Sequence, residues 1–65
     1  MKPQAKDVIN CYSATHGEIR NAEVVHVGKA KIHMFNEKGT YVTRLSNLHS
    51  IVLVYRKVDD LDLGI

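Results

Sequence analysis

The stretch that decides the fold runs from residue 30 to residue 45 and reads Ala-Lys-Ile-His-Met-Phe-Asn-Glu-Lys-Gly-Thr-Tyr-Val-Thr-Arg-Leu. Side chains of alternating character fill its two halves, and this alternation is typical of strands buried on one face only. The four residues between the halves suit a hairpin loop, because Gly39 can take the left-handed conformation that ends it. The stretch therefore predicts an antiparallel hairpin. Its facing pairs are Met34 with Tyr41, Ile32 with Thr43, and Lys31 with Arg44.

A second turn signal, Gly28-Lys29, comes just before this hairpin. Treated as a two-residue turn, it sets Val25 opposite Ile32 and Val24 opposite His33. The two predicted registers agree and divide the side chains between two faces of one sheet. The predicted core face holds Val25, Val27, Ala30, Ile32, Met34, Tyr41 and Leu45. The predicted outer face holds His26, Lys31, His33, Phe35, Val42 and Arg44.

The last strand-like segment, residues 50–57, contains the apolar run Ile-Val-Leu-Val-Tyr at positions 51–55. The run does not alternate, which predicts cover on both faces and hence a strand that is central in the sheet or buried at a subunit contact. The short polar stretch 45–49 before it suits a single turn.

The N-terminal stretch, residues 3–15, supports two interpretations. Pro3 near a start, Gly17 just past an end and apolar residues at helical spacing suit a helix. The run 8–12, Val-Ile-Asn-Cys-Tyr, favours a strand by composition, and His16-Gly17 then suits a hairpin turn. The strand is the preferred interpretation.

Length and composition indicate one small globular domain. The chain has 65 residues, 45% of them apolar and 25% charged, which predicts a single domain over residues 1–57 with a thin core. Residues 58–65 form an acidic and apolar tail that can fray, add as a strand to a neighbouring sheet, or cover a basic face. One cysteine cannot close an intrachain disulfide, so we expect homo-oligomerisation to add stability.

Charge and hydropathy restrict the expected surroundings. No apolar run is long enough to span a membrane, and the first residues lack the apolar core of a signal peptide, so we expect a cytoplasmic protein without a membrane partner. The net charge of +2 combines a basic body with three aspartates in the tail. Such a body attracts phosphates only modestly.

The order of strands and turns resembles a known fold type. The segments 17–28, 30–35 and 41–48, the turn ending at Gly39 and the final apolar strand look like an SH3-like small barrel of the Tudor or Sm-like kind, over residues 7–57. The resemblance implies a five-stranded, strongly bent antiparallel sheet that recognises peptides, modified side chains, RNA or DNA. It also implies that Tyr12 and Phe35 could flank a cationic ligand, although the chain has no tryptophan and no acidic residue could be placed beside them.

Catalytic and metal chemistry find little support in the residues. Cys11 has no orienting partner or oxyanion loop in the sequence and is expected to be a small buried residue. The four histidines, His16, His26, His33 and His49, lack the cysteine pairs or helical spacing of a zinc site. We therefore expect neither an enzyme nor a protein that holds a metal or another cofactor.

The predicted outer face carries the functional hypothesis. Cations can hold phosphates while an exposed aromatic ring stacks on a base, which is the recipe for recognising single-stranded nucleic acid on a small sheet. The candidate binding residues are His26, Lys31, His33, Phe35 and Arg44. This predicts a small regulatory module that binds RNA or single-stranded DNA. The alternatives are that these side chains only pack under a partner or face solvent, and that the chain is a protein-binding adaptor or inhibitor of the sort that phages and plasmids encode.

Overall fold

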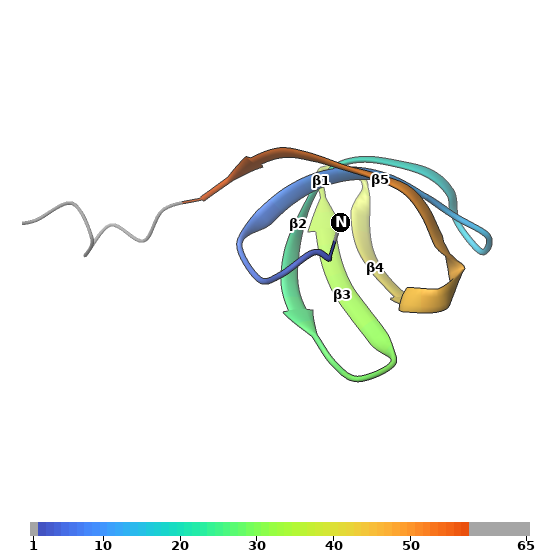
Figure 1. Cartoon of the computed structure of the whole chain (residues 1–65). Helices are drawn as coiled ribbons and strands as arrows, with labels where there is room; N and C mark the ends of the chain where they lie inside the picture. The colour runs from blue at the N-terminus through green and yellow to red at the C-terminus, as the bar shows by residue number, and fades with distance from the viewer. Residues whose placement is uncertain (1, 58–65) are drawn as a thin grey trace, which may run out of the picture.

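The computed structural model describes residues 2–57, which form an all-β fold of five antiparallel strands (Figure 1). The strands and one 3-10 helix are β1 (Asp7–Ser13), β2 (Gly17–Val27), β3 (Lys31–Asn36), β4 (Gly39–Arg44), η1 (Leu45–Asn47) and β5 (Leu48–Arg56). The predicted all-β class is confirmed. The N-terminal stretch that could have been a helix is a strand, and the 45–49 stretch contains the expected single turn. The predicted tail, residues 58–65, lies outside the described residues.

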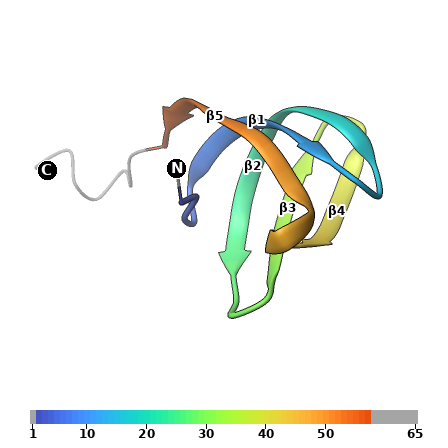
Figure 2. The same cartoon turned by 45° about the vertical axis from the view of Figure 1, so that its right-hand side comes forward.

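The strands form one sheet in the order β4-β3-β2-β1-β5. The sheet curls on itself, so that β1 and β5 run steeply across the direction of β3 and β4 (Figures 1 and 2). Two residues with positive φ accompany this bending, Asn21 in β2 at 53° and Ser50 in β5 at 54°. Each lies where the pairing register with β1 shifts, and a bulge of this kind increases strand twist. The Asn10 side chain holds the first bulge by accepting a hydrogen bond from the Asn21 amide at 2.8 Å.

The hairpin of β3 and β4 has the predicted register. Lys31 pairs with Arg44, Ile32 with Thr43 and Met34 with Tyr41. The loop is tighter than expected, since Asn36 and Gly39 are already paired and only two residues form the turn. Gly39 has a φ of 144°, and the Asn36 side chain accepts a hydrogen bond from the Lys38 amide at 2.8 Å.

The predicted register of β2 against β3 is wrong. His26 pairs with His33 and Val24 with Met34, and the register shifts between these two pairs. This irregularity around Val25 exchanges the two adjacent valines, so that Val24 is fully buried while Val25 is 55% exposed. Ala30 is exposed in the loop before β3 and does not contribute to the predicted core face.

Of the two positions predicted for the apolar run 51–55, the central strand is wrong, and burial at a subunit contact stays a prediction. The strand that contains the run, β5, is an edge of the sheet and not a central strand. Residues 52–55 are between 41 and 57% exposed, and only Ile51 packs partly against the core. An edge strand keeps one row of backbone groups unpaired, so β5 can accept a further strand on its outer side.

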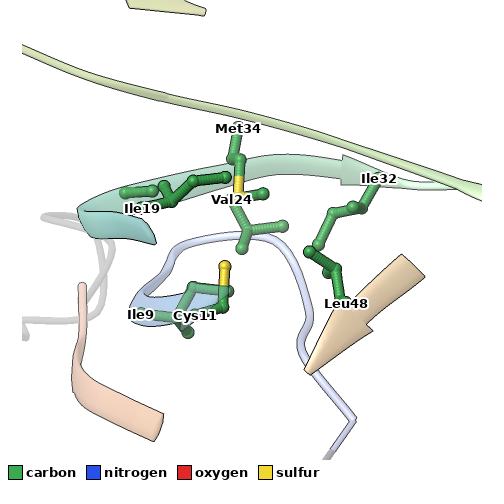
Figure 3. Packing of buried hydrophobic residues seen from close by; sticks show 8 residues of the cluster. Ile9, Cys11, Ile19, Val24, Ile32, Met34 and Leu48 are labelled. Atoms are coloured by element: carbon green, nitrogen blue, oxygen red, sulfur yellow. The ribbon is translucent and has the colours of Figure 1, made fainter. Parts of the chain in front are cut away.

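The core lies inside the curl of the sheet. The members labelled in Figure 3 come from four strands: Ile9, Cys11, Ile19, Val24, Ile32, Met34 and Leu48. The thiol of Cys11 points toward Val24 and is only 4% exposed as a residue, as predicted for a small buried side chain. Burial raises the pKa of this thiol, because a thiolate is disfavoured in an apolar environment.

Buried polar groups in this fold are paired. The hydroxyl of Ser13, a fully buried residue, accepts hydrogen bonds from the Thr15 and His16 amides at 3.1 and 3.2 Å and so closes the turn between β1 and β2. It also lies 3.4 Å from the Thr43 hydroxyl. Within the described residues no buried side-chain polar atom lacks a partner, as expected of a well-ordered core.

Candidate functional site

The structure places the five predicted binding residues on one exposed face of the sheet. Three cross-strand rows order them, because paired residues of neighbouring strands point to the same side. The first row is Lys31 and Arg44, the second is His26, His33 and Val42, and the third is Glu23, Phe35 and Thr40. His26, Lys31, His33, Phe35 and Arg44 are all exposed. We call this surface the outer face.

One end of the outer face is basic. Lys31, the first residue of β3, lies opposite Arg44, the last residue of β4. Neither side chain makes an ion pair within residues 2–57; the recorded pairs there join Glu18 with Arg20, Asp7 with Arg56, and Glu23 with Lys57. The two cations are therefore open to an external anion.

Two histidines lie beside this basic pair. The rings of His26 and His33 meet edge to face with their centroids 5.9 Å apart. The predicted register set Val24 opposite His33, and the observed register pairs His33 with His26 instead. No group of three or more His, Cys, Asp or Glu side chains that could hold a metal ion occurs among the residues described.

The other end of the outer face is an acidic and aromatic hollow of about 360 Å³. Four paired residues from β5, β1, β2 and β3 form a row across it, Tyr55, Val8, Glu23 and Phe35. Glu37 and Lys57 also line the hollow. Phe35 is 41% and Tyr55 is 52% exposed, so the hollow has two aromatic flanks and a carboxylate between them.

Lys57 already occupies part of this hollow. Its Nζ lies 2.6 Å from Oε1 of Glu23, and this hydrogen bond raises the pKa of the Lys57 ammonium. Because β1 lies between β5 and β2, the lysine side chain has to cross β1 to reach Glu23. Val8, whose place in the row is between Tyr55 and Glu23, is outside the core cluster and yet only 4% exposed.

Apart from Phe35, the residues of this hollow were not predicted from the sequence. The predicted register of β2 against β3 was off by one at this point and set Phe35 opposite Ala22, so it could not reveal Glu23 as the acidic neighbour of Phe35. Tyr12, the expected companion of Phe35, lies farther along β1 and pairs with Glu18 and His49. Tyr55 shares the row of Phe35 instead. The one signal in the sequence was the pair of adjacent valines, Val24 and Val25, either of which could be the buried residue if the strand contains a bulge.

Comparisons with known proteins give no relative: no family model matches the chain, and neither a curated protein nor a solved structure is significantly similar to it. Within the described residues no helix is long and apolar enough to cross a membrane. The site has to be interpreted from its own chemistry.

Proposed function

We propose that the chain is a small nucleic-acid-binding module that holds RNA or single-stranded DNA on the basic end of its outer face. The observation that supports this most is the cross-strand pair of Lys31 and Arg44, two exposed cations without a counter-ion in residues 2–57. Paired cations on a sheet are suited to phosphate, and Arg adds the geometry for two parallel hydrogen bonds.

The neighbouring residues are compatible with this function. His33 and Phe35 follow Lys31 on the same side of β3, so the aromatic ring lies about 13 Å from the lysine along the strand. This separation allows a strand of nucleic acid to place phosphates on the cations and a base against Phe35. The five-stranded bent sheet is compatible with an SH3-like small barrel, and we propose that class for the fold.

The test is direct binding of labelled single-stranded RNA and DNA of mixed sequence, measured by fluorescence anisotropy at low salt and again at several higher salt concentrations. We expect binding that weakens steeply with salt, because phosphate contacts release counterions. Absence of binding to both polymers at the lowest salt would refute the proposal.

A second function is favoured by β5. Four consecutive side chains of this edge strand, residues 52–55, are exposed and apolar, and exposed apolar edges are sites of strand addition. We propose a second copy as the occupant. Antiparallel pairing centred on Leu53 would set Val52 opposite Val54 and Ile51 opposite Tyr55, which brings apolar side chains together.

The two functions respond differently to ionic strength. A β5 contact buries apolar surface and changes little with salt, whereas phosphate binding falls steeply. Sedimentation equilibrium over a range of protein and salt concentrations measures self-association through β5 in the absence of nucleic acid.

A further inference from the structure

The hollow at the acidic end of the outer face has a chemistry opposite to that of the basic end. Its row of Tyr55, Val8, Glu23 and Phe35 combines apolar and aromatic surface with one carboxylate, and Glu37 adds a second acidic residue to the lining. Glu23 is only partly accessible, with 23% of its side chain exposed. A carboxylate in such a position attracts a cation more strongly than one in open solvent.

The chain itself shows what kind of group this hollow accepts. The Lys57 ammonium lies 2.6 Å from Glu23, and its aliphatic stem reaches that position from the residue that directly follows β5, the strand that carries Tyr55. The occupant is thus a long side chain with an apolar stem and a cationic end. The ion pair is not locked, because 51% of the Lys57 side chain is exposed, and exposed pairs of this kind contribute little to stability.

We propose that this hollow is a binding site for an arginine side chain of a partner protein, which displaces Lys57 from Glu23. The proposed site goes beyond nucleic-acid binding and does not depend on it. Arginine fits better than lysine because its planar guanidinium can donate hydrogen bonds to Glu23 and at the same time stack on the exposed ring of Phe35, which is the cross-strand neighbour of Glu23. Val8 and Tyr55 then contact the stem of the incoming side chain or the partner residues beside it.

Lys57 competes with an incoming arginine for the carboxylate of Glu23. An incoming arginine binds only when Lys57 has left Glu23, so the apparent affinity is the intrinsic affinity multiplied by the fraction of molecules in which the hollow is free. Removal of the lysine side chain should therefore strengthen binding, although it removes a charge and a contact from the protein. A residue that merely stabilised the fold would not have this effect.

The experiment uses the full chain and N-acetyl-arginine methylamide as the probe, followed by ¹H–¹⁵N correlation spectra at constant pH and ionic strength. We expect weak, saturable shifts at the amides of Glu23, Phe35 and Tyr55. The matched citrulline compound, which has the same shape without the charge, should give none. In Lys57→Ala the affinity for the arginine probe should rise about two- to fivefold, as expected when a surface ion pair no longer competes.

Two further variants complete the design. Glu23→Gln should abolish the saturable shifts while its dispersed spectrum shows a folded protein, and Lys29→Ala, which removes a lysine from the exposed loop before β3, should bind as the wild type does. The proposal is overturned if citrulline binds equally well, if Glu23→Gln retains binding, or if Lys57→Ala binds no more tightly than the wild type. None of these variants alters Lys31 or Arg44, so failure here leaves the nucleic-acid test unaffected.

Discussion

The carboxylate of Asp7, the first residue of β1, accepts a hydrogen bond from Nε of Arg56, the last residue of β5, 49 positions later in the chain. Asp7 is fully buried, and its other carboxylate oxygen accepts a hydrogen bond from the backbone N–H of Gln4 at 3.1 Å. The Gln4 side-chain oxygen, once its amide is oriented toward the guanidinium, accepts from Arg56 Nη2 at 2.7 Å. This cluster ties the N-terminal segment to the end of the edge strand.

The Asp7 cluster predicts acid-sensitive stability. The hydrogen bond from Arg56 holds the pKa of Asp7 below its ordinary value, although burial acts in the opposite direction. A carboxyl whose pKa is lower in the folded state stabilises the protein above the pKa of the unfolded chain and loses this contribution as the pH falls through the folded value. Thermal melts of the wild type should therefore show a falling Tm below about pH 4.

Asp7→Asn should remove that acid dependence. The amide keeps the shape of the carboxylate but not its charge, and loss of a hydrogen bond to a charged partner should lower the Tm near neutral pH by roughly 5–10 °C in a domain of this size. The difference in Tm between wild type and variant should shrink as the pH approaches 3. Glu37→Gln, in the exposed turn between β3 and β4, is the control. An equal difference at pH 7 and pH 3 would contradict the role assigned to Asp7.

Cys11 should behave as a packing residue. Cys11→Ala removes one buried sulfur atom and should cost about 1 kcal/mol in the free energy of unfolding, with nucleic-acid binding unchanged. In the wild type the thiol should react slowly with a disulfide reagent until denaturant is added, because burial raises its pKa and the thiolate is the reactive form. Chemical denaturation and a colorimetric thiol assay measure the two effects. Loss of binding in a folded Cys11→Ala protein would show that the thiol has a chemical role.

A charge in the β5 edge should prevent self-association. Val54→Lys places a lysine in the exposed apolar stretch, a substitution that natural sheets use to protect their edges. Sedimentation equilibrium should show a monomer for this variant and a dimer for the wild type at high micromolar concentration. The matched control is Val25→Lys on β2, since Val25 is similarly exposed. A wild type that stays monomeric would leave β5 without the proposed partner.

The basic pair should determine the salt dependence of nucleic-acid binding. The double change Lys31→Ala and Arg44→Ala should weaken binding to all sequences alike and flatten the slope of log K against log salt by about 1.4, which corresponds to two phosphate contacts on a single strand. Both side chains are exposed, so the variant should remain folded. An unchanged slope would show that the phosphates lie elsewhere.

Phe35→Ala should act on affinity in another way. Loss of a stacked base should cost about 1–3 kcal/mol of binding free energy while the salt slope stays nearly constant. Anisotropy titrations at three salt concentrations separate this effect from that of the cations. A Phe35→Ala protein that binds RNA and single-stranded DNA as the wild type does would remove the ring from the nucleic-acid site.

How far the sequence could predict this molecule depends on the kind of signal each segment carries. The β3–β4 hairpin was predictable pair by pair because a strict alternation and a short loop leave one register. The β2–β3 pairing was not, since Val24 and Val25 are chemically equivalent and the pattern cannot say which of them is buried at a bulge.

The position of β5 shows a different limit. An unbroken apolar run predicts that both faces of a strand avoid water, but it does not distinguish a central strand from an edge strand that meets another molecule. The basic end of the outer face could be predicted from the sequence because the β3–β4 hairpin alone pairs Lys31 with Arg44. The acidic hollow was not, because Val8, Glu23 and Tyr55 come together only through the pairings of β1 with β2 and β5.

The interior position of β1, between β2 and β5, has a consequence for synthesis on the ribosome. This strand is made before the other four, yet one of its two neighbours is β5, the last strand of the described chain. Until β5 has been translated, β1 offers the nascent chain an open edge, and the side of the core that Leu48 closes is exposed to water. Because domains fold as units during synthesis, a chain that stops before residue 48 should lack a stable core, and messages that are cut short should yield products open to proteolysis instead of partly active fragments.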